Sequence, residues 1–566
     1  MYLHTGWDKF ARDLALEPDC QLTFLYEGDG EMIVNVVDDT SCRRQYNTGE
    51  SGSDTDTIHG ASAQALLDLL LFLVPLVLLL VGWKRWSRRR IKQRPNLPLP
   101  PSPPFKLPVI GHLHLVGSLP HVSFRDLSRK HGRDLMLLRL GAVNTVVVSS
   151  PRAAEAVLRT HDHALASRAR SAVADIIFYG SSDVGFAPYG EPWRQARKVV
   201  TTHMLSTRKV HALRHGREEE VPIAVAKIRA SAATAAAVDM SEHLHSYATD
   251  VVCRAVLGRH HGDDGRNKLV RELADINMSL LGGFNLDDYF PGFAIVGVFT
   301  GLVVCRRAIR VRKRWDELFL KLMDQQGRHR EQGDDASSDF IHVLLSLQEE
   351  YGLTTDNVKA IVMVSKHVMA KLQEEVRRRH TLGPAVGAED REEPQQDVVT
   401  EEELVDMAYL RATVKETLRL HPPTPLLIPH LSMADCEIDG YTIPSGTRLM
   451  VNAWALARDP ASWDTPEEFA PERFLPGGSA ATLNGKGRDF EYLPFGSGRR
   501  ICPGINFANA AVELMLANLV YHFDWELPAK MKEVDMKEVF SLSIRRKEKL
   551  LLVPVSRSIP LSDKRE

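Results

Sequence analysis

The spacing of apolar residues predicts a chain body built mainly from helices. Over several long stretches, apolar side chains recur every three to four positions, as they do along one face of an α-helix. These stretches are 218–236, 250–257, 308–328, 339–350, 410–420 and 506–521. A further helix is predicted to begin at Ser150-Pro151, where a capping side chain precedes a first-turn proline, and to continue through Thr160.

Strand patterns are short and occupy a small part of the chain. Residues 134–140 and 145–148 flank a turn at 141–144 and predict a β-hairpin. A second hairpin is predicted at 436–443, and a further strand at 447–452. The two patterns together predict a fold that is mainly α with a small β region.

The first 47 residues carry a pattern of their own. A short amphipathic helix is predicted at 7–16, and strands are predicted at 22–26 and 31–37. Residues 48–64 follow as a linker that is rich in Ser, Gly, Asp and Thr and cannot bury a core. We therefore predict a small N-terminal piece, at 1–47, that is separate from the body.

Three runs in this piece resemble the C-terminal half of a plant B3-type DNA-binding domain. They are Gly6-Trp7-Asp8-Lys9-Phe10, Leu22-Thr23-Phe24 and Ile33-Val34-Asn35-Val36. Residues 1–60, however, contain twelve acidic and four basic residues, whereas a DNA-binding face is basic. Nucleic acid is therefore not expected as a partner, and the piece is interpreted as a partial domain.

A single membrane anchor is predicted at 65–83. This run is apolar apart from Asp68, and its nineteen residues approach the length that crosses a bilayer. Seven Lys and Arg residues follow within 84–94, which favours a cytosolic location for everything after the anchor. Residues 84–108 are basic and proline-rich and are predicted to be a stiff hinge before the body at 109–566.

The composition of the chain indicates the redox compartment of its body. The chain has 44% hydrophobic and 25% charged residues and a net charge of −2, which are ordinary values for a folded protein. Its six cysteines have neither CxxC nor zinc-ligand spacing. This pattern favours reduced thiols in a body that faces the cytosol over a disulfide framework.

The candidate chemistry lies in the run from Phe495 to Gly504, FGSGRRICPG. A thiolate that ligates iron must be kept deprotonated and shielded, and a glycine-rich loop allows backbone amides to approach its sulfur. Cys502 is thus the candidate metal ligand, with Gly498 and Gly504 giving close approach, Arg500 reaching an acidic group of the cofactor, and Phe495 covering the sulfur. An ordinary buried cysteine is the alternative, but five fixed positions favour the ligand.

Two further patterns precede this loop. Trp193 and Arg197 lie four residues apart and share one helix face, from which both can reach a carboxylate. Taken alone, this spacing is more often that of a structural tryptophan beside a solvated arginine. Glu416 and Arg419 are spaced for an ion pair, and Arg473 can complete a three-residue network with them. The alternative for that pair is an exposed surface contact.

In this order, the motifs resemble those of the cytochrome P450 family, and the anchor and proline hinge resemble its plant microsomal A-type members. The resemblance spans 65–557. It implies a haem b held by Cys502, located in a body at the endoplasmic reticulum membrane, and electrons from NADPH through a partner reductase. It also implies the insertion of one oxygen atom from O2 into a small apolar specialised metabolite. The implied haem contacts are Trp193, Arg197, His430, Phe495, Gly498, Arg500 and Gly504.

The chain departs from the family at its central helix. Family members carry a proton-relay motif in a long helix on the distal side of the haem. Here 352–363 resembles the start of that helix and 366–376 the element that follows it, so that only Val364 and Ser365 lie between them. The sequence therefore predicts a P450 fold lacking most of its central distal helix, and it identifies no catalytic residue.

The expected consequence is an impaired monooxygenase. The sequence leaves two alternatives open. One is a non-catalytic or defective haem-binding protein from a mis-joined gene model, and the other is a haem enzyme that rearranges hydroperoxides without a reductase and so needs no proton relay.

Overall fold

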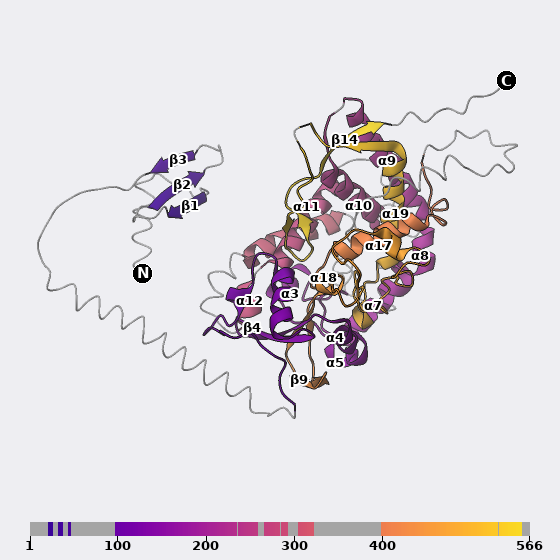
Figure 1. Cartoon of the computed structure of the whole chain (residues 1–566). Coiled ribbons are helices and arrows are strands. Elements are labelled where there is room, and N and C mark those ends of the chain that lie inside the picture. The colour runs from indigo at the N-terminus through magenta and orange to yellow at the C-terminus, as the bar shows by residue number, and fades with distance from the viewer. Residues whose placement is uncertain are drawn as a thin grey trace, which may run out of the picture. The chain divides into compact units, whose positions relative to one another are not determined.

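The computed structural model of the chain describes three short N-terminal strands and most of the body. The described body residues are 97–234, 236–257, 265–283, 285–291, 304–321, 398–529 and 531–556. The chain divides into two compact units, Met1–Lys92 and Gln93–Glu566 (Figure 1). Several predicted features lie outside the described residues: the helix at 7–16, the linker at 48–64, the anchor at 65–83, the hinge up to residue 96, the helix at 339–350, and the segments 352–363 and 366–376 with the junction at 364–365.

The N-terminal unit contains a three-stranded antiparallel sheet. Its strands are β1 (Gln21–Tyr26), β2 (Met32–Val37) and β3 (Arg43–Tyr46), in the order β1-β2-β3. Both predicted strands are present, and β3 is an addition that its polar sequence, RRQY, did not suggest.

Throughout the described parts of the chain, no helix is long and apolar enough to cross a membrane.

A four-stranded sheet forms one end of the main unit. Its order is β4-β5-β10-β7, with β5 and β10 parallel and the other pairs antiparallel. The predicted hairpin is confirmed as β4 (Leu135–Leu140) and β5 (Val143–Val148), and the predicted strand at 447–452 is confirmed as β10 (Arg448–Val451). The fourth strand is β7 (His430–Leu431).

Both faces of this sheet are buried. Val146 and Val148 belong to one apolar cluster, whereas Val147 belongs to another. Successive residues of a strand point to opposite faces, so the two clusters lie on the two sides of the sheet. Burial on both sides explains the continuous apolar run at 146–148.

Where it is described, the proline-rich segment is tied to this sheet and to the separate hairpin at 436–443. The Leu137 N–H donates to the carbonyl of Pro101 at 2.8 Å, and the Thr442 N–H donates to the carbonyl of Pro98 at 2.9 Å. The prolines of this segment have no N–H of their own, so they contribute acceptors only. Residues 97–101 are thereby fixed along the edge of the body.

The helices pack into one large apolar core. In Figure 1 the helix α19 (Ile505–His522) lies beside α17 (Ala408–Leu420) and α9 (Arg214–Ala232), and it contacts both. Residues 514–520 of α19 are all buried, which a helix requires when other elements surround it. The remaining long helices are α3 (Pro120–His131), α7 (Glu191–Val199), α10 (Met240–Leu257), α11 (Arg266–Gly282) and 304–321.

Short elements connect these parts. The helical ones are η1 (Leu113–Leu115), α4 (Pro151–Glu155), η2 (Ala156–Thr160), α5 (Asp162–Leu165), α6 (Ala172–Ile177), η3 (Val200–Met204), α8 (Thr207–Ala212), α12 (Leu286–Tyr289), α18 (Ala453–Leu456), η4 (Pro471–Phe474) and η5 (Gly498–Arg500). The strands are β6 (Val238–Asp239), β8 (Cys436–Ile438), β9 (Tyr441–Ile443), β11 (Phe523–Glu526), β12 (Glu538–Val539), β13 (Arg545–Arg546) and β14 (Leu551–Ser556). The fold is mainly α with a small β region, as predicted.

The predicted cap at Ser150 is confirmed. The Ser150 hydroxyl accepts a hydrogen bond from the Ala153 N–H at 3.3 Å, and Pro151 begins α4. The helix continues to Thr160 through η2, a π-helical turn.

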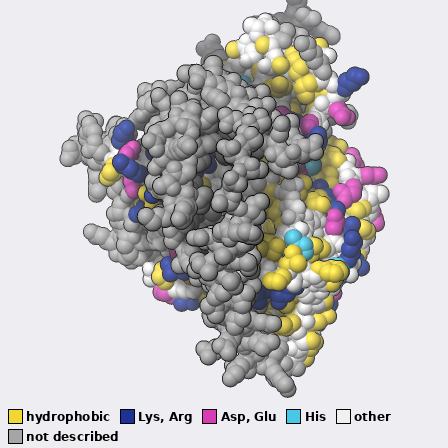
Figure 2. Space-filling view, turned by 90° about the vertical axis from the view of Figure 1, so that its left-hand side faces the viewer, with side chains coloured by type: hydrophobic (Ala, Val, Ile, Leu, Met, Phe, Trp, Pro, Cys, Tyr) yellow, Lys and Arg dark blue, Asp and Glu magenta, His cyan; other side chains and the backbone are white. Residues whose placement is uncertain are grey.

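On the described part of the face in Figure 2, side chains of both charge signs lie among apolar ones.

Candidate functional site

The loop that carries Cys502 is closed by its own backbone. The Cys502 N–H donates to the carbonyl of Phe495 at 3.0 Å. Gly498 has a φ of +67°, and a Cβ added there would lie 2.0 Å from the carbonyl oxygen of Leu158. Only glycine satisfies both the left-handed backbone and this close approach. The loop therefore needs Gly498 for its shape.

Two groups favour the thiolate form of Cys502. Burial raises the pKa of its thiol, whereas the Gly504 N–H and the charge of Arg197 lower it. A metal ion at the sulfur would supply the remaining positive charge that deprotonates a coordinating thiol.

Helix α7 places Trp193 and Arg197 beside this loop. Trp193 is buried, and its indole N–H donates to the carbonyl of Val184 at 3.0 Å. The Arg197 guanidinium is half-buried, and no hydrogen-bond or ion-pair partner for it exists among the described residues. Burial lowers its pKa. A partly buried cation without a partner is a candidate ligand for an anion.

Arg500 lies in the same region with its donors directed at backbone carbonyls. It donates to Ala166 at 2.7 Å and to Ala187 at 2.7 Å, and its guanidinium lies 4.2 Å from the centre of the Trp193 ring. Burial lowers the pKa of Arg500 to about 10. The side chain is thus held in one orientation by the protein itself.

Two residues of this region were missed by the sequence analysis. Arg168 is 6% exposed and donates to the carbonyls of Gly185 and Pro429, each at 3.0 Å. Asp183 is fully buried, and its Oδ1 accepts from the N–H groups of Gly185 and Phe186. Burial raises the pKa of Asp183 to about 6, and the charge of Arg500 opposes that rise. Neither residue lies in a motif, so no local signal marks it.

His430 is buried beside these arginines. Its Nδ1 lies 2.8 Å from the carbonyl oxygen of Leu165, which can only accept, so Nδ1 carries the proton. Burial, followed by the charges of Arg168 and Arg500, holds the pKa of His430 well below its usual value. In this neutral form Nε2 is an acceptor, so His430 donates to a carboxylate only after protonation.

The charges at the site suit a dianionic group. Arg168, Arg197 and Arg500 approach one region, which also contains the carboxylates of Asp183 and Asp162. Asp162 pairs with a further arginine, Arg499, so positive charge is in excess there. Buried charges are stable only when compensated. Haem carries two propionate carboxylates, which would compensate this excess, and Cys502 supplies the thiolate that its iron can bind. The residues present therefore fit a haem.

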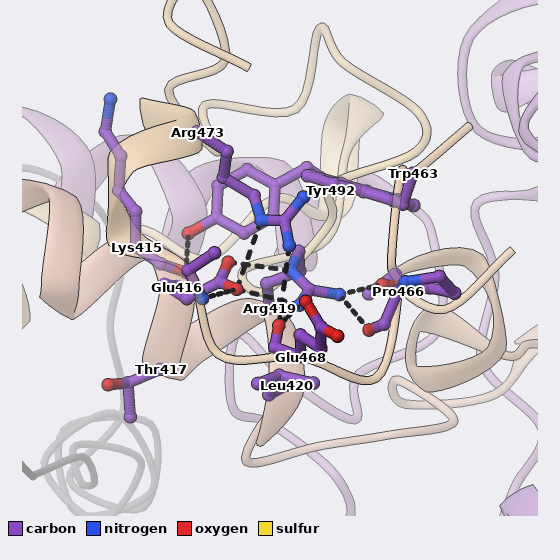
Figure 3. A network of polar contacts seen from close by, with 12 residues as sticks. Lys415, Glu416, Thr417, Arg419, Leu420, Trp463, Pro466, Glu468, Arg473 and Tyr492 are labelled. Carbon is purple, nitrogen blue, oxygen red and sulfur yellow. Dashed lines mark hydrogen bonds and ion pairs between the residues drawn. The ribbon is translucent and has the colours of Figure 1, made fainter. Parts of the chain in front are cut away.

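Glu416, Arg419 and Arg473 form a buried network (Figure 3). The Glu416 carboxylate receives two hydrogen bonds from Arg419, at 2.7 and 2.8 Å, and one from Arg473 Nε at 3.1 Å. The Arg419 guanidinium also donates to the carbonyls of Pro466 and Glu468, at 2.7 and 2.9 Å. Glu416 and Arg419 have no exposed side-chain surface. The network joins α17 to the segment that precedes the cysteine loop.

The chain matches known proteins along most of its length. The family model described as Cytochrome P450 matches residues 100–365 and 363–553. Two proteins of Zea mays, indolin-2-one monooxygenase and 3-hydroxyindolin-2-one monooxygenase, are each 53% identical to it. The first alignment covers 88% of this chain and 96% of the relative, and the second covers 83% and 89%.

A solved structure shares the fold. The zebrafish cytochrome P450 with progesterone superposes with a TM-score of 0.60, over 77% of this chain and 99% of that one. The sequence identity is 24%, so this likeness concerns the fold alone.

Proposed function

This chain belongs to the cytochrome P450 family, the haem-thiolate monooxygenases, and we propose that it binds haem b through Cys502 and receives electrons from NADPH through a partner reductase. The observation that carries the haem proposal is the half-buried Arg197, which has no partner in the described structure and lowers the pKa of the Cys502 thiol. When bound, the haem would supply oxygen activation that its thiolate ligand promotes.

The other site residues would orient the cofactor. We assign Arg197 and Arg500 to the propionates, with Trp193 supporting Arg500 through its ring face. His430 would join them in its protonated form. Phe495, Gly498 and Gly504 would shape the loop beneath the macrocycle, and the Glu416–Arg419–Arg473 network would hold the preceding segment in place.

The substrate proposal rests on the relatives. Indolin-2-one monooxygenase and indole-2-monooxygenase of Zea mays are 53% and 52% identical to this chain. We propose that the substrate is a small, planar, bicyclic indole derivative and that oxygen is inserted at a carbon of that ring system. Such a molecule is largely apolar with few polar atoms, as a P450-type pocket requires.

We also propose a single-pass anchor at 65–83 in the endoplasmic reticulum membrane, with the catalytic body in the cytosol. The length of this apolar run and the seven basic residues after it support the proposal.

Finally, we propose that activity is impaired because the distal proton-relay segment is missing. The family match is divided into two stretches that meet at 363–365. The alignment with indolin-2-one monooxygenase runs over 527 positions but uses 88% of 566 residues, about 498, which leaves about 29 positions without a residue of this chain. A helix of about eight turns at 3.6 residues per turn has a similar length.

The test compares two proteins in one assay. The chain as it stands, and a chain with the central segment of the maize indolin-2-one monooxygenase inserted between Val364 and Ser365, are combined with reductase and NADPH and given indolin-2-one. We expect oxygenation by the repaired chain at a rate at least about 100-fold above that of the original, because a lost proton donor costs on this order. Equal oxygenation rates of the original and the repaired chain would refute the proposal that activity is impaired. Inactivity of both, despite bound haem, would refute the substrate proposal.

A further inference from the structure

One segment, 162–189, contacts the cysteine loop at two successive residues. Its backbone carbonyls accept hydrogen bonds from Arg500. Its first and last residues, Asp162 and Tyr189, contact the preceding residue, Arg499. The loop therefore depends for its position on a segment that lies more than 300 positions away in the sequence.

The Asp162 carboxylate contacts Arg499 through both its backbone and its side chain. The Asp162 Oδ2 accepts a hydrogen bond from the Arg499 N–H at 3.0 Å, and Oδ1 forms an ion pair with Arg499 Nε at 2.9 Å. The same Oδ2 lies against the glycine that gives the loop its shape, because a Cβ added at Gly498 would be 3.1 Å from it. The carboxylate thus contacts the turn η5, which ends two positions before Cys502.

The hydrogen bond from the backbone is the contact that fixes this turn. The Asp162 side chain is 14% exposed, whereas that of Arg499 is 48% exposed. Water screens an ion pair with so exposed an arginine, so the pair contributes little. A hydrogen bond from a backbone N–H to a carboxylate is stronger than one between neutral groups, and it acts on the main chain itself. Burial raises the pKa of Asp162, and the Arg499 N–H opposes that rise.

Tyr189 restrains only the far end of the Arg499 side chain. Nη1 of Arg499 donates to the Tyr189 hydroxyl at 2.7 Å, and the guanidinium lies 5.7 Å from the centre of the Tyr189 ring. The Tyr189 N–H donates in turn to the Ser167 hydroxyl at 3.2 Å. These contacts leave the backbone of Arg499 to be held by Asp162.

We propose that Asp162 is a positioning residue that fixes the cysteine loop through the Arg499 N–H, so that Cys502 can serve as the iron ligand. This inference rests on the proposed function, because the ligand role of Cys502 is part of it. Asp162 has no contact with the cofactor in this proposal and acts only through the main chain of the loop. Loss of a residue that orients a metal ligand typically weakens metal affinity or activity by about 10- to 100-fold.

The first test follows the loop without the cofactor. In the haem-free full chain, mass spectrometry measures the rates at which iodoacetamide labels Cys502 and Cys253. Cys253 is 3% exposed on helix α10, so its labelling reports a general loosening of the fold. We expect Asp162→Ala to raise the labelling rate of Cys502 by about 10-fold relative to that of Cys253, because the turn before Cys502 loses a charge-assisted hydrogen bond.

The second test uses the haem-loaded full chain. It measures the fraction of the reduced carbon monoxide complex that shows a thiolate-type band, and the rate of haem release. We expect Asp162→Ala to lower that fraction and to release haem about 10-fold faster. Asp162→Asn should retain most of the band, because its amide oxygen can still accept the Arg499 N–H. Asp459→Ala is the matched control, since Asp459 is also 14% exposed, pairs with Arg133 and accepts the N–H of Ala461.

Three results would overturn the proposal. The first is a labelling rate of Cys502 that Asp162→Ala leaves unchanged or raises no more than that of Cys253. The second is an Asp162→Ala chain whose band and haem release match those of Asp459→Ala. The third is an Asp162→Asn chain that loses the band as fully as Asp162→Ala. An unaltered chain without a thiolate-type band would reject the proposed function, and the labelling of Cys502 would still decide whether Asp162 holds the loop.

Discussion

At the scale of single residues, the environment of Cys502 is set by burial and by arginines. The thiol is buried, which alone would keep it protonated, and Arg197 and the Gly504 N–H act in the opposite direction. Arg197 differs from Arg500 in one respect that matters for binding. Arg500 donates three of its five N–H groups to backbone carbonyls, whereas Arg197 has no partner in the described structure. Arg197 is therefore the residue whose removal should affect a bound anion most directly.

Arg197→Gln is expected to weaken haem binding by about 10- to 100-fold, since a charge-assisted hydrogen bond contributes about 1.5–3 kcal/mol. The measurement is a titration of the haem-free chain with haem, followed by absorbance. Arg194→Gln is the matched control, because Arg194 lies on the same helix but is exposed and pairs with Glu191. Equal haem affinities of the two variants would show that Arg197 does not bind the cofactor.

The sequence could identify only part of this site. Cys502, Arg500 and Gly498 lie in one short run whose spacing is itself the signal. Arg168 and Asp183 come from segments more than 300 positions away and are brought to that run by the tertiary fold. The roles of Trp193 and Arg500 also depend on carbonyls of 166–187, which no side-chain pattern reveals.

At the scale of elements, α17 depends on its buried ion pair. The spacing of Glu416 and Arg419 predicted the pair, and the sequence also suggested Arg473, but the carbonyl acceptors of Arg419 could not be foreseen. An exposed pair at this spacing contributes little, whereas removing one partner of a buried pair leaves the other charge buried and uncompensated.

Glu416→Ala is expected to lower the free energy of unfolding by about 3–5 kcal/mol, because Arg419 and Arg473 would then be buried without a counter-charge. Urea unfolding of the main unit measures the change. Glu191→Ala provides the comparison, because Glu191 forms the same i,i+3 pair with Arg194 on the surface. This substitution should lower the free energy of unfolding by less than about 1 kcal/mol. Similar costs for the two variants would contradict the role assigned to burial.

Helix α19 carries a carboxyl group whose charge opposes folding. Burial raises the pKa of Glu513 to about 7, above its ordinary value in an unfolded chain. The folded state therefore favours the protonated form, and stability falls as the pH rises from about 4.5 to about 7. Glu513→Gln should stabilise the protein by about 1–3 kcal/mol at pH 8 and have no effect near pH 4. Urea unfolding at both pH values tests this, with the exposed Glu526→Gln as control. A gain in stability that does not change with pH would refute the raised pKa of Glu513.

At the scale of the whole molecule, the sequence predicted the fold class and part of the described elements, but not the helices α3 and α11. The mainly helical body, the hairpin β4–β5 and the helix α19 follow from apolar spacing. Helix α10 begins at Met240, ten residues before its predicted start, because its first turns carry polar residues such as Glu242 and His243 that obscure the apolar spacing. The order β4-β5-β10-β7 joins segments about 300 positions apart, and local patterns contain no information about such pairing.

Deletion of residues 1–94 is expected to release the protein from membranes, because it removes the apolar run at 65–83 and the basic residues after it. Alkaline extraction of microsomal membranes measures the change. The full chain should remain in the pellet and the shortened chain should appear in the supernatant. A shortened chain that still resists extraction would place the main membrane contact in the body.

The central claim is that Cys502 ligates haem iron as a thiolate. The most direct measurement is the carbon monoxide difference spectrum of the reduced, haem-loaded full chain beside that of Cys502→Ser. We expect a thiolate-type band for the full chain and its loss in the variant, with haem still bound through the arginines. Identical spectra for the two proteins would contradict it.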